Sequence, residues 1–554
     1  MKFKGILLAT AASLLAAGPA FGQAASAPNS GDIENKIQAL QSELERLKAA
    51  QDQIRGLQQE LDAMKASEAA AKDAADRERA ARDAAELDAR KEAEHAAPIL
   101  LAQNVPLPPA QAATNVPLVN FITYKGVTIT LGGFLAFETV FRSRSELGDI
   151  GSSFSGIPLA NSPFNHLQEF RATARQSRLA LLVQGNPNPT THLAMYGEFD
   201  FLAGPGSANS NESNSYSPRI RHLYGTADWD DLGIHILAGQ NWSLLTLNAV
   251  GENPRTELPP PTIDAQYSVG FLWTRQPQLR IVKDFNKQLY IGISIENPQE
   301  TVNTGLQGGA IVTANHVTFN GAPMAGLFSP NTVLSTNHIP DFIGKIAFDP
   351  DPAHQFHFEV MGMWRDFYDR ANFTNHNVSA ASVGVGAFIK VIPGTLDLQA
   401  TAMYGQGIGR YETSQLSDAT LRPDGVLEPL TQHSELLGLT WHATPFWDLY
   451  VFGGESVDLK KLYTFNAAPS GYGNPAAVNT GCFSETVGGA CTANNQSIQQ
   501  IAAGTWDNVY SGIYGQLRIG LQYSYTKRKT FDGVGGAPAP DENMFFTSFR
   551  YYPF

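Results

Sequence analysis

The sequence predicts an all-β transmembrane barrel of 16 antiparallel strands, preceded by an N-terminal α-helical coiled coil. Three observations predict it. After residue 118 apolar and polar side chains alternate with a period of two, the connections between the predicted strands alternate between short and long, and charged residues are few. Asp, Glu, Lys and Arg make up 16% of the 554 residues, below the roughly 25% typical of soluble domains. The 50 Gly and 33 Pro indicate many turns and strands rather than a helical core.

Residues 1–22 have the features of a secretory signal peptide. Lys2 and Lys4 precede an apolar stretch at 5–17, and Ala-Phe-Gly at 20–22 fits a small-x-small cleavage site. We therefore expect an exported protein; the alternative, an uncleaved membrane anchor, needs a longer apolar segment. No run of about 20 apolar residues follows the first 25 positions, which excludes helical membrane spans.

Residues 32–65 are predicted to form a short coiled coil. Core positions recur there at spacings of four and three, as in a heptad repeat, and all but two of them are apolar: Ile33, Ile37, Leu40, Leu44, Leu47, Gln51, Ile54, Gln58 and Leu61. The pattern indicates self-association and is too narrow for a single helix lying on the barrel. Residues 66–97, rich in Ala and charges without an apolar face, are expected to be a solvated helix or frayed. Prolines between 98 and 117 favour an extended linker, and the barrel is assigned to 118–554.

The two-faced strand pattern is clearest where Phe356, Phe358 and Val360 alternate with His357 and Glu359. One face of such a strand suits lipid and the other suits water. The predicted strands are 127–143, 168–185, 190–202, 219–229, 232–245, 265–285, 288–296, 339–348, 354–366, 380–391, 395–410, 433–444, 447–457, 496–510, 513–530 and 543–554. Short turns on one side, long loops on the other and an even strand number are typical of outer-membrane barrels, and a soluble sandwich has no reason to show them.

Seven charged side chains are expected on the inner, pore-lining face from strand parity: Arg178, Arg221, Arg280, Arg365, Arg518, Glu198 and Asp200. Two interpretations stay open. Either the arginines form a basic constriction that attracts small anions, or they pair with the acids and brace the wall.

The third external loop, 246–264, is a candidate constriction loop. It contains Glu252, Arg255 and Glu257, followed by three prolines at 259–261. A segment this stiff either folds inward and narrows the pore or lies exposed on the surface, and the sequence does not distinguish these arrangements.

Two further features fit an exported barrel. Cys482 and Cys491 lie in a Gly- and Asn-rich stretch, and we expect a local disulfide because zinc would have only two of its usual four ligands there. The terminal Phe554 is expected to be recognised by the barrel-insertion machinery. No metalloprotease, nucleophile-elbow or phosphate-loop motif occurs, so we expect no enzymatic activity, no cofactor and no metal.

The barrel region resembles the DcaP-like family of outer-membrane porins. The resemblance rests on four short segments: Ala174-Arg175-Gln176-Ser177-Arg178-Leu179, Arg221-His222-Leu223-Tyr224, Gly239-Gln240-Asn241-Trp242 and Arg275-Gln276-Pro277-Gln278-Leu279-Arg280. It implies a homotrimer of sixteen-stranded barrels with a periplasmic helical extension and channels that favour small carboxylates. It also implies that Arg178, Arg221 and Arg280 are pore residues.

The function expected from these observations is passive diffusion of small polar solutes across the outer membrane, with a preference for small anions. The alternative is a structural or adhesive outer-membrane barrel with little conductance. A TonB-dependent active transporter is disfavoured because no plug domain precedes the barrel. The expected partners are outer-membrane lipid, other copies of the chain and small-molecule solutes, and no nucleic acid.

Overall fold

The computed structural model describes residues 121–203, 217–320, 334–351, 353–486 and 488–554, and six helical residues between 38 and 58. The chain divides into two units, Met1–Thr114 and Asn115–Phe554. Apart from those six residues, the predicted signal peptide, coiled coil, 66–97 segment and 98–117 linker lie outside the described residues. Among the described residues, no helix combines the length and apolar character that crossing a membrane requires.

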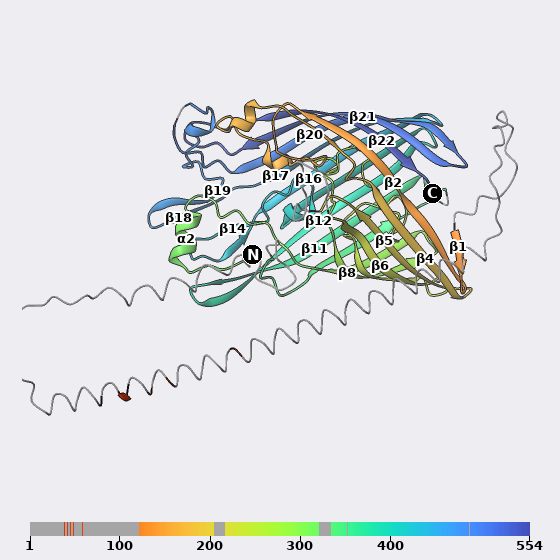
Figure 1. Cartoon of the computed structure of the whole chain (residues 1–554), viewed down its shortest axis with the longest axis horizontal. Helices are drawn as coiled ribbons and strands as arrows, with labels where there is room; N and C mark the ends of the chain where they lie inside the picture. Colours follow the sequence, from red (N-terminus) through yellow and green to blue (C-terminus); the bar gives the residue numbers. More distant parts are fainter. Residues whose placement is uncertain are drawn as a thin grey trace, which may run out of the picture. The chain divides into compact units, whose positions relative to one another are not determined.

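The second unit is a closed antiparallel barrel, drawn in Figure 1. Its sheet has 18 strands, of which β1 (Phe121–Tyr124) and β3 (Glu169–Thr173) only extend the pairing beside β2, so 18 − 2 = 16 strands form the described wall. The wall strands are β2 (Val127–Arg142), β4 (Arg178–Asn188), β5 (Thr191–Asp200), β6 (Arg219–Trp229), β7 (Ile234–Trp242), β8 (Arg275–Phe285), β9 (Leu289–Glu296), β10 (Asp341–Phe348), β11 (Phe356–Ala371), β12 (Thr374–Ile392), β13 (Leu396–Gln406), β16 (Thr431–Thr444), β17 (Trp447–Asp458), β20 (Asn495–Gly512), β21 (Gly515–Thr530) and β22 (Asp541–Tyr552). Pairing of β2 with β22, from Leu135↔Tyr551 to Arg142↔Met544, closes the ring. The predicted sixteen-strand barrel is confirmed.

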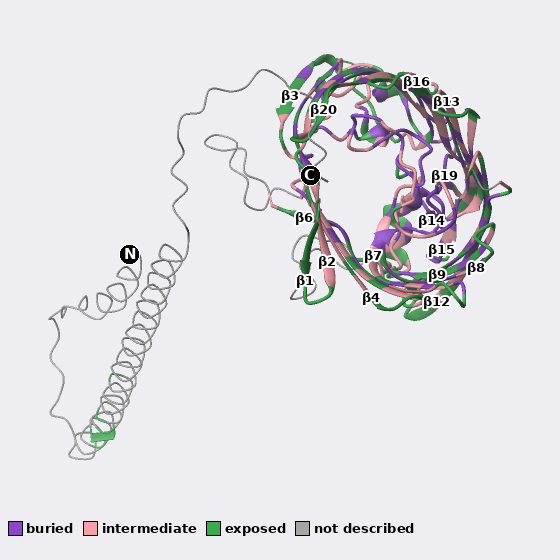
Figure 2. Ribbon diagram, turned by 90° about the vertical axis from the view of Figure 1, so that its right-hand side faces the viewer, coloured by how far each residue is buried: buried purple, intermediate pink, exposed green. Residues whose placement is uncertain are grey.

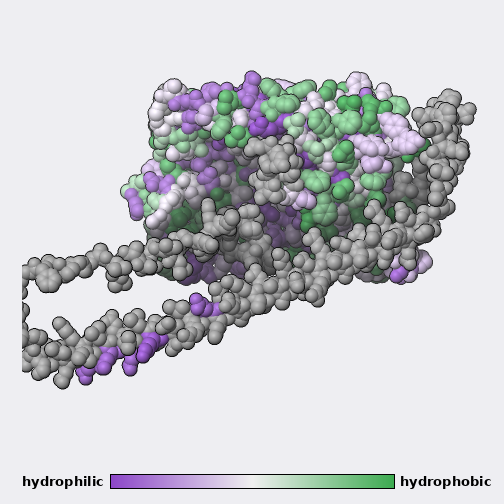
Figure 3. Space-filling model, in the orientation of Figure 1, coloured by the Kyte–Doolittle hydropathy of each residue, from purple (hydrophilic) through white to green (hydrophobic). Residues whose placement is uncertain are grey.

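The period-two pattern separates the two faces of the wall. Along β8, Leu279 and Ile281 are 46% and 49% exposed, whereas Gln278 and Arg280 are 7% and 2% exposed. Figure 3 shows hydrophobic side chains gathered over the outer surface of the strands. An apolar outer surface of this extent is suited to a hydrocarbon environment rather than to water.

Several predicted strand bounds need correction. The strand predicted at 265–285 begins only at Arg275, because 265–274 belongs to the loop described below. The strand predicted at 168–185 is split into β3 and β4 by a turn in which the Ser177 N–H donates to the Ala174 carbonyl (3.0 Å). The connection predicted between 366 and 380 is wrong, since β11 and β12 continue to a tight turn at Asn372 and Phe373, both with positive φ. These strand ends lack clear alternation, so periodicity did not reveal them.

The remaining elements lie in the loops: η1 (Phe154–Gly156), η2 (Pro163–His166), α2 (Gly308–Ala314), η3 (Gly409–Tyr411), β14 (Ala419–Leu421), β15 (Leu427–Pro429), β18 (Lys461–Phe465), β19 (Ala468–Tyr472) and η4 (Thr480–Cys482). Strands β14 and β15 form one hairpin, and β18 and β19 form another. Figure 2 looks into the ring of strands, and buried loop segments lie within its outline.

Candidate functional site

The segment between β7 and β8, residues 243–274, folds into the barrel and is called the inward loop here. Its start is bound to β10, where the Lys345 Nζ donates to the Thr246 carbonyl (2.7 Å). Its middle reaches far-wall strands, where the Gln399 Nε2 donates to the Leu258 carbonyl (2.9 Å). The candidate loop 246–264 therefore lies inside the barrel, and the inward segment is longer than the sequence indicated.

Apolar packing explains why this loop folds inward. Ile263, Val269 and Phe271 are at most 1% exposed and pack in one cluster with the wall residues Phe452 and Phe546. Burying apolar surface stabilises by about 25 cal/mol per Å², so releasing these side chains into water would be costly. The stiff proline segment is also held, because Trp506 donates its indole N–H to the Pro261 carbonyl (2.7 Å).

The predicted acids Glu198 and Asp200 lie beside predicted arginines. Arg221 is 2% exposed; its guanidinium binds Glu198, and its Nη1 lies 3.0 Å from Asp200 Oδ2. The Arg178 Nη1 lies 3.8 Å from Glu198 Oε1. Arg219, which was not predicted, also pairs with Asp200 at 2.7 Å. The structure thus brings three arginines and two acids together on β4, β5 and β6.

Arg365 is in a separate buried network. It is 1% exposed, its Nε lies 3.1 Å from Asp341 Oδ2, and its Nη1 lies 3.1 Å from Asp418 Oδ1. Two carboxylates around one guanidinium match the bracing interpretation, because a buried charge is stable only when it is paired.

Arg518 lines a cavity of about 220 Å³ between the proline segment and the wall. Its Nη2 lies 3.2 Å from Asp448 Oδ2, and its guanidinium lies 5.1 Å from the centre of the Trp506 ring. His442 lies between Asp448 (2.7 Å) and Asp397 (3.2 Å) in the same cavity. This end of the interior therefore contains both signs of charge.

Arg280 has different surroundings from the paired arginines. It donates to the Trp242 carbonyl (2.6 Å) and to Gln278 Oε1 (3.1 Å), and it has no acidic partner among the described residues. On the inward loop, Arg255 is exposed, and its backbone N–H donates to Glu257 Oε2 (2.7 Å). The predicted charged residues therefore fall into several clusters rather than one ring.

Arg275, at the start of β8, is a second arginine that strand parity did not predict. Its guanidinium stacks 4.5 Å from the ring centre of Trp242 and 5.9 Å from that of Trp273. Its Nη1 and the Trp273 indole N–H are shielded from solvent and have no hydrogen-bond acceptor within the described residues. A signal was present in the sequence, since Arg275 begins one of the four resemblance segments, but the expected strand start at 265 hid its position at the end of the loop.

The arginines near Arg275 outnumber the acids. Arg178, Arg219 and Arg221 interact electrostatically with Arg275, and this group of four guanidiniums faces only two carboxylates, those of Glu198 and Asp200. The group keeps an excess of positive charge at the base of the inward loop. Such an excess attracts anions when the site is open to water.

Acidic residues of the inward loop itself are also buried. Burial raises the pKa of Glu252 to about 7, and nearby Lys345 only partly opposes this increase. Burial likewise raises the pKa of Asp264 to about 6, although its carboxylate accepts the Ser152 N–H (3.1 Å). Near neutral pH these acids are therefore close to their titration range.

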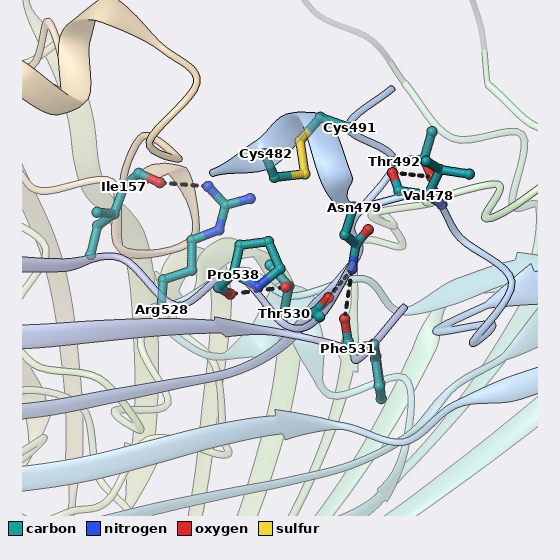
Figure 4. Close-up of a disulfide and its surroundings, with 11 residues drawn as sticks. Ile157, Val478, Asn479, Cys482, Cys491, Thr492, Arg528, Thr530, Phe531 and Pro538 are labelled. Carbon is teal, nitrogen blue, oxygen red and sulfur yellow. Dashed lines mark hydrogen bonds between the residues drawn. A yellow bond between two sulfur atoms is a disulfide. The ribbon is translucent and has the colours of Figure 1, made fainter. Parts of the chain in front are cut away.

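Cys482 and Cys491 form a disulfide in the loop between β17 and β20, drawn in Figure 4. The Asn479 side chain holds the same loop by donating to the Phe531 (3.2 Å) and Gly536 (2.8 Å) carbonyls. Within the described ranges, no three His, Cys, Asp or Glu side chains are grouped so that they could hold a metal ion.

Comparison with solved structures shows that the barrel shares the fold of an outer-membrane channel. The outer-membrane channel DcaP of Acinetobacter baumannii matches with a TM-score of 0.55 and 18% sequence identity, over 78% of this chain and 100% of that chain. An anion-selective porin from Comamonas acidovorans matches with a TM-score of 0.42 and 9% identity, over 77% of this chain and 99% of that chain. No family model and no curated protein matches the chain. The predicted resemblance to DcaP-like porins is thus confirmed at the level of the fold.

Proposed function

We propose that this chain is an outer-membrane porin through which small polar solutes diffuse, with a preference for small anions such as carboxylates. The observation that best supports it is the inward loop, which narrows the interior of a sixteen-strand barrel without a plug domain among the described residues. Solute choice in such a channel depends on the side chains beside the narrowest region.

The excess of arginines at the base of the inward loop supports the anion preference. Arg275 pairs with no acid in the described part of the chain, so its positive charge is not neutralised by a neighbouring carboxylate, whereas the charge of Arg365 is. Carboxylates accept charge-assisted hydrogen bonds from guanidinium groups, which makes them suitable ligands for this position.

Planar-bilayer recording of the purified full chain tests the proposal. We expect discrete conductance steps and, in a salt gradient, a reversal potential of the sign for anion preference. A preference for cations would contradict the anion assignment, while silence at high protein concentration would contradict the porin assignment. Silence would favour a structural or adhesive barrel, an alternative supported by how much of the interior the loops occupy.

The assembly proposal is a homotrimer stabilised by the segment at 32–65, of which the structure describes only six residues. Mass measurement in mild detergent would compare the intact chain with a variant lacking 23–97. We expect a trimer for the intact chain and dissociation of the shortened one. If both are monomers, self-association is rejected.

A further inference from the structure

Five ionisable residues are buried together where the inward loop begins. They come from the loop, from β10 and the turn after it, and from β11, and each is at most 2% exposed: Glu252, Lys345, Asp349, His357 and Glu359. A buried charge is costly unless an opposite charge or hydrogen bonds compensate for its loss of hydration.

This cluster holds the inward loop by its backbone. The Asn248 N–H donates to Glu359 Oε1 (2.9 Å), and the Gly251 N–H donates to Asp349 Oδ2 (2.9 Å). The ammonium group of Lys345 connects both parts, since it lies 2.8 Å from Glu359 Oε2 and donates to the Thr246 carbonyl. The position of the loop therefore depends on these charges.

Four of the five charges balance. The His357 Nδ1 lies 2.8 Å from Asp349 Oδ1, and its Nε2 lies 3.0 Å from Glu359 Oε1. Because a carboxylate only accepts hydrogen bonds, both ring nitrogens must donate, and the imidazole carries a positive charge. Lys345 and His357 then neutralise Asp349 and Glu359.

Glu252 is the fifth group and makes no ion pair among the described residues. It is 0% exposed, and neither carboxylate oxygen has a hydrogen-bond partner within the described residues. Gly292 on β9 makes room for it, since a Cβ there would lie 2.0 Å from Glu252 Oε2. The other charged or titratable groups that face it are Arg280 on β8, Tyr290 on β9, Lys345 on β10, and His357 and Glu359 on β11.

We propose that Glu252 is a proton switch for the inward loop, which stays seated against β10 and β11 while Glu252 is protonated and loosens when it ionises. The inference rests on the proposed function only in its physiological meaning, as regulation of the pore. The seating itself is a property of the folded chain.

The pH dependence of loop seating follows from the different pKa values of the Glu252 carboxyl group in the seated and the released loop. In a released loop Glu252 would titrate near its usual 4.5, whereas burial in the seated loop raises its pKa to about 7. The seated state therefore binds more protons between these values, so the added stability is fully present below about pH 4.5 and is lost as pH rises through about 7. The seating equilibrium should weaken on the order of a hundredfold across this range.

Hydrogen exchange of the full chain in detergent tests the switch without requiring conductance. The peptide containing Asn248 and Gly251 would be followed in the wild-type chain and in Glu252→Gln, whose neutral amide stands for the protonated acid. Exchange rates in the two chains should agree at about pH 5, while the wild-type rate should be at least about tenfold faster at about pH 8.5. Asp231→Asn, which removes an exposed charge in the β6–β7 turn, should behave like the wild type.

Equal exchange in the wild type and Glu252→Gln at every pH would overturn the switch. If Glu252→Gln does not fold, Glu252→Met provides a second neutral side chain of similar length for the same comparison. Bilayer recording then gives a separate readout, in which wild-type current noise should rise with pH and Glu252→Gln should stay quiet. If the protein conducts no current but its hydrogen exchange depends on pH as described, the porin assignment is rejected and the proton switch is supported.

Discussion

Arg365 and Arg275 both lie on wall strands and face the interior, yet their surroundings differ. Arg365 is held between Asp341 and Asp418 and is 1% exposed. Arg275 is only partly buried, stacks on two tryptophan rings and has no acidic partner in the described ranges. An inward arginine can therefore be neutralised within the wall or keep an unpaired charge, and its partners decide which.

The largest effect is expected from Arg365→Met, which would leave two buried carboxylates without a cation. Breaking a buried pair in this way costs about 3–5 kcal/mol, so the unfolding temperature of the barrel in detergent should fall markedly. Arg422→Met is the matched control, because the Arg422–Asp424 pair (2.8 Å) is largely exposed and such pairs contribute about 0–1 kcal/mol. Similar losses of stability in both variants would remove the distinction between a wall arginine and a surface arginine.

Gly454→Ala tests whether the inward loop positions the region around Arg275. A Cβ at Gly454 would lie 1.9 Å from the Val269 carbonyl oxygen, so the loop must move away from the wall and into the interior. We expect single-channel conductance to fall by roughly half, since conduction depends on the narrowest cross-section. The neighbour Gly453 offers a control, because its Cβ would meet only the Gln500 carbonyl at 3.7 Å and Gly453→Ala should conduct normally. Unchanged conductance in Gly454→Ala would show that this loop does not set the constriction.

Arg275→Gln should change selectivity while leaving stability nearly unaltered. Because the Arg275 guanidinium has no acidic partner, its removal leaves no buried carboxylate without a cation, and stability should change little. The local positive field becomes weaker, so the anion-to-cation permeability ratio should fall about two- to threefold. Reversal potentials in a salt gradient give this ratio directly. Arg171→Gln removes an exposed arginine of β3 and should keep the original ratio. A fall in thermal stability as large as that of Arg365→Met would show that Arg275, like Arg365, stabilises the barrel.

Reduction of the Cys482–Cys491 disulfide should have the smallest effect. The bridge closes a loop with a sequence separation of 9, and the Asn479 hydrogen bonds hold the same region independently. Constraining a loop this short stabilises by about 3 kcal/mol or less, and locally. Reduced protein should be cleaved faster by protease in this loop while conductance and selectivity stay the same. A change in selectivity would mean that the loop contributes to the solute path.

Most of the barrel could be predicted from the sequence because apolar and polar side chains alternate along its strands. Parity placed Arg280 and Arg365 toward the interior, and the structure buries both of these side chains. It failed where a segment is buried on all sides, as at 265–274, since an apolar loop packed inside a barrel lacks alternation just as a buried strand does.

Pairing between charges could not be predicted, because partners come from distant parts of the chain. Arg365, for example, binds Asp418, which lies in a loop that follows β13. Strand parity predicts on which face of the sheet a side chain lies. It does not predict which residues lie beside that side chain, because this depends on strand register and on the path of the loops. The choice between a basic constriction and a braced wall therefore needed the three-dimensional structure.

The seam between β2 and β22 has a consequence for how the molecule is made. Thr139 and Thr547 share a hydrogen bond across it (2.6 Å) although they are 408 residues apart in the chain. Contacts so remote in sequence form slowly, because the intervening chain must first be ordered. Until the last strand arrives, β2 and β21 each present an unpaired backbone edge, which is costly in hydrocarbon. Loss of even the final dozen residues should therefore leave an open, aggregation-prone sheet rather than a slightly smaller barrel.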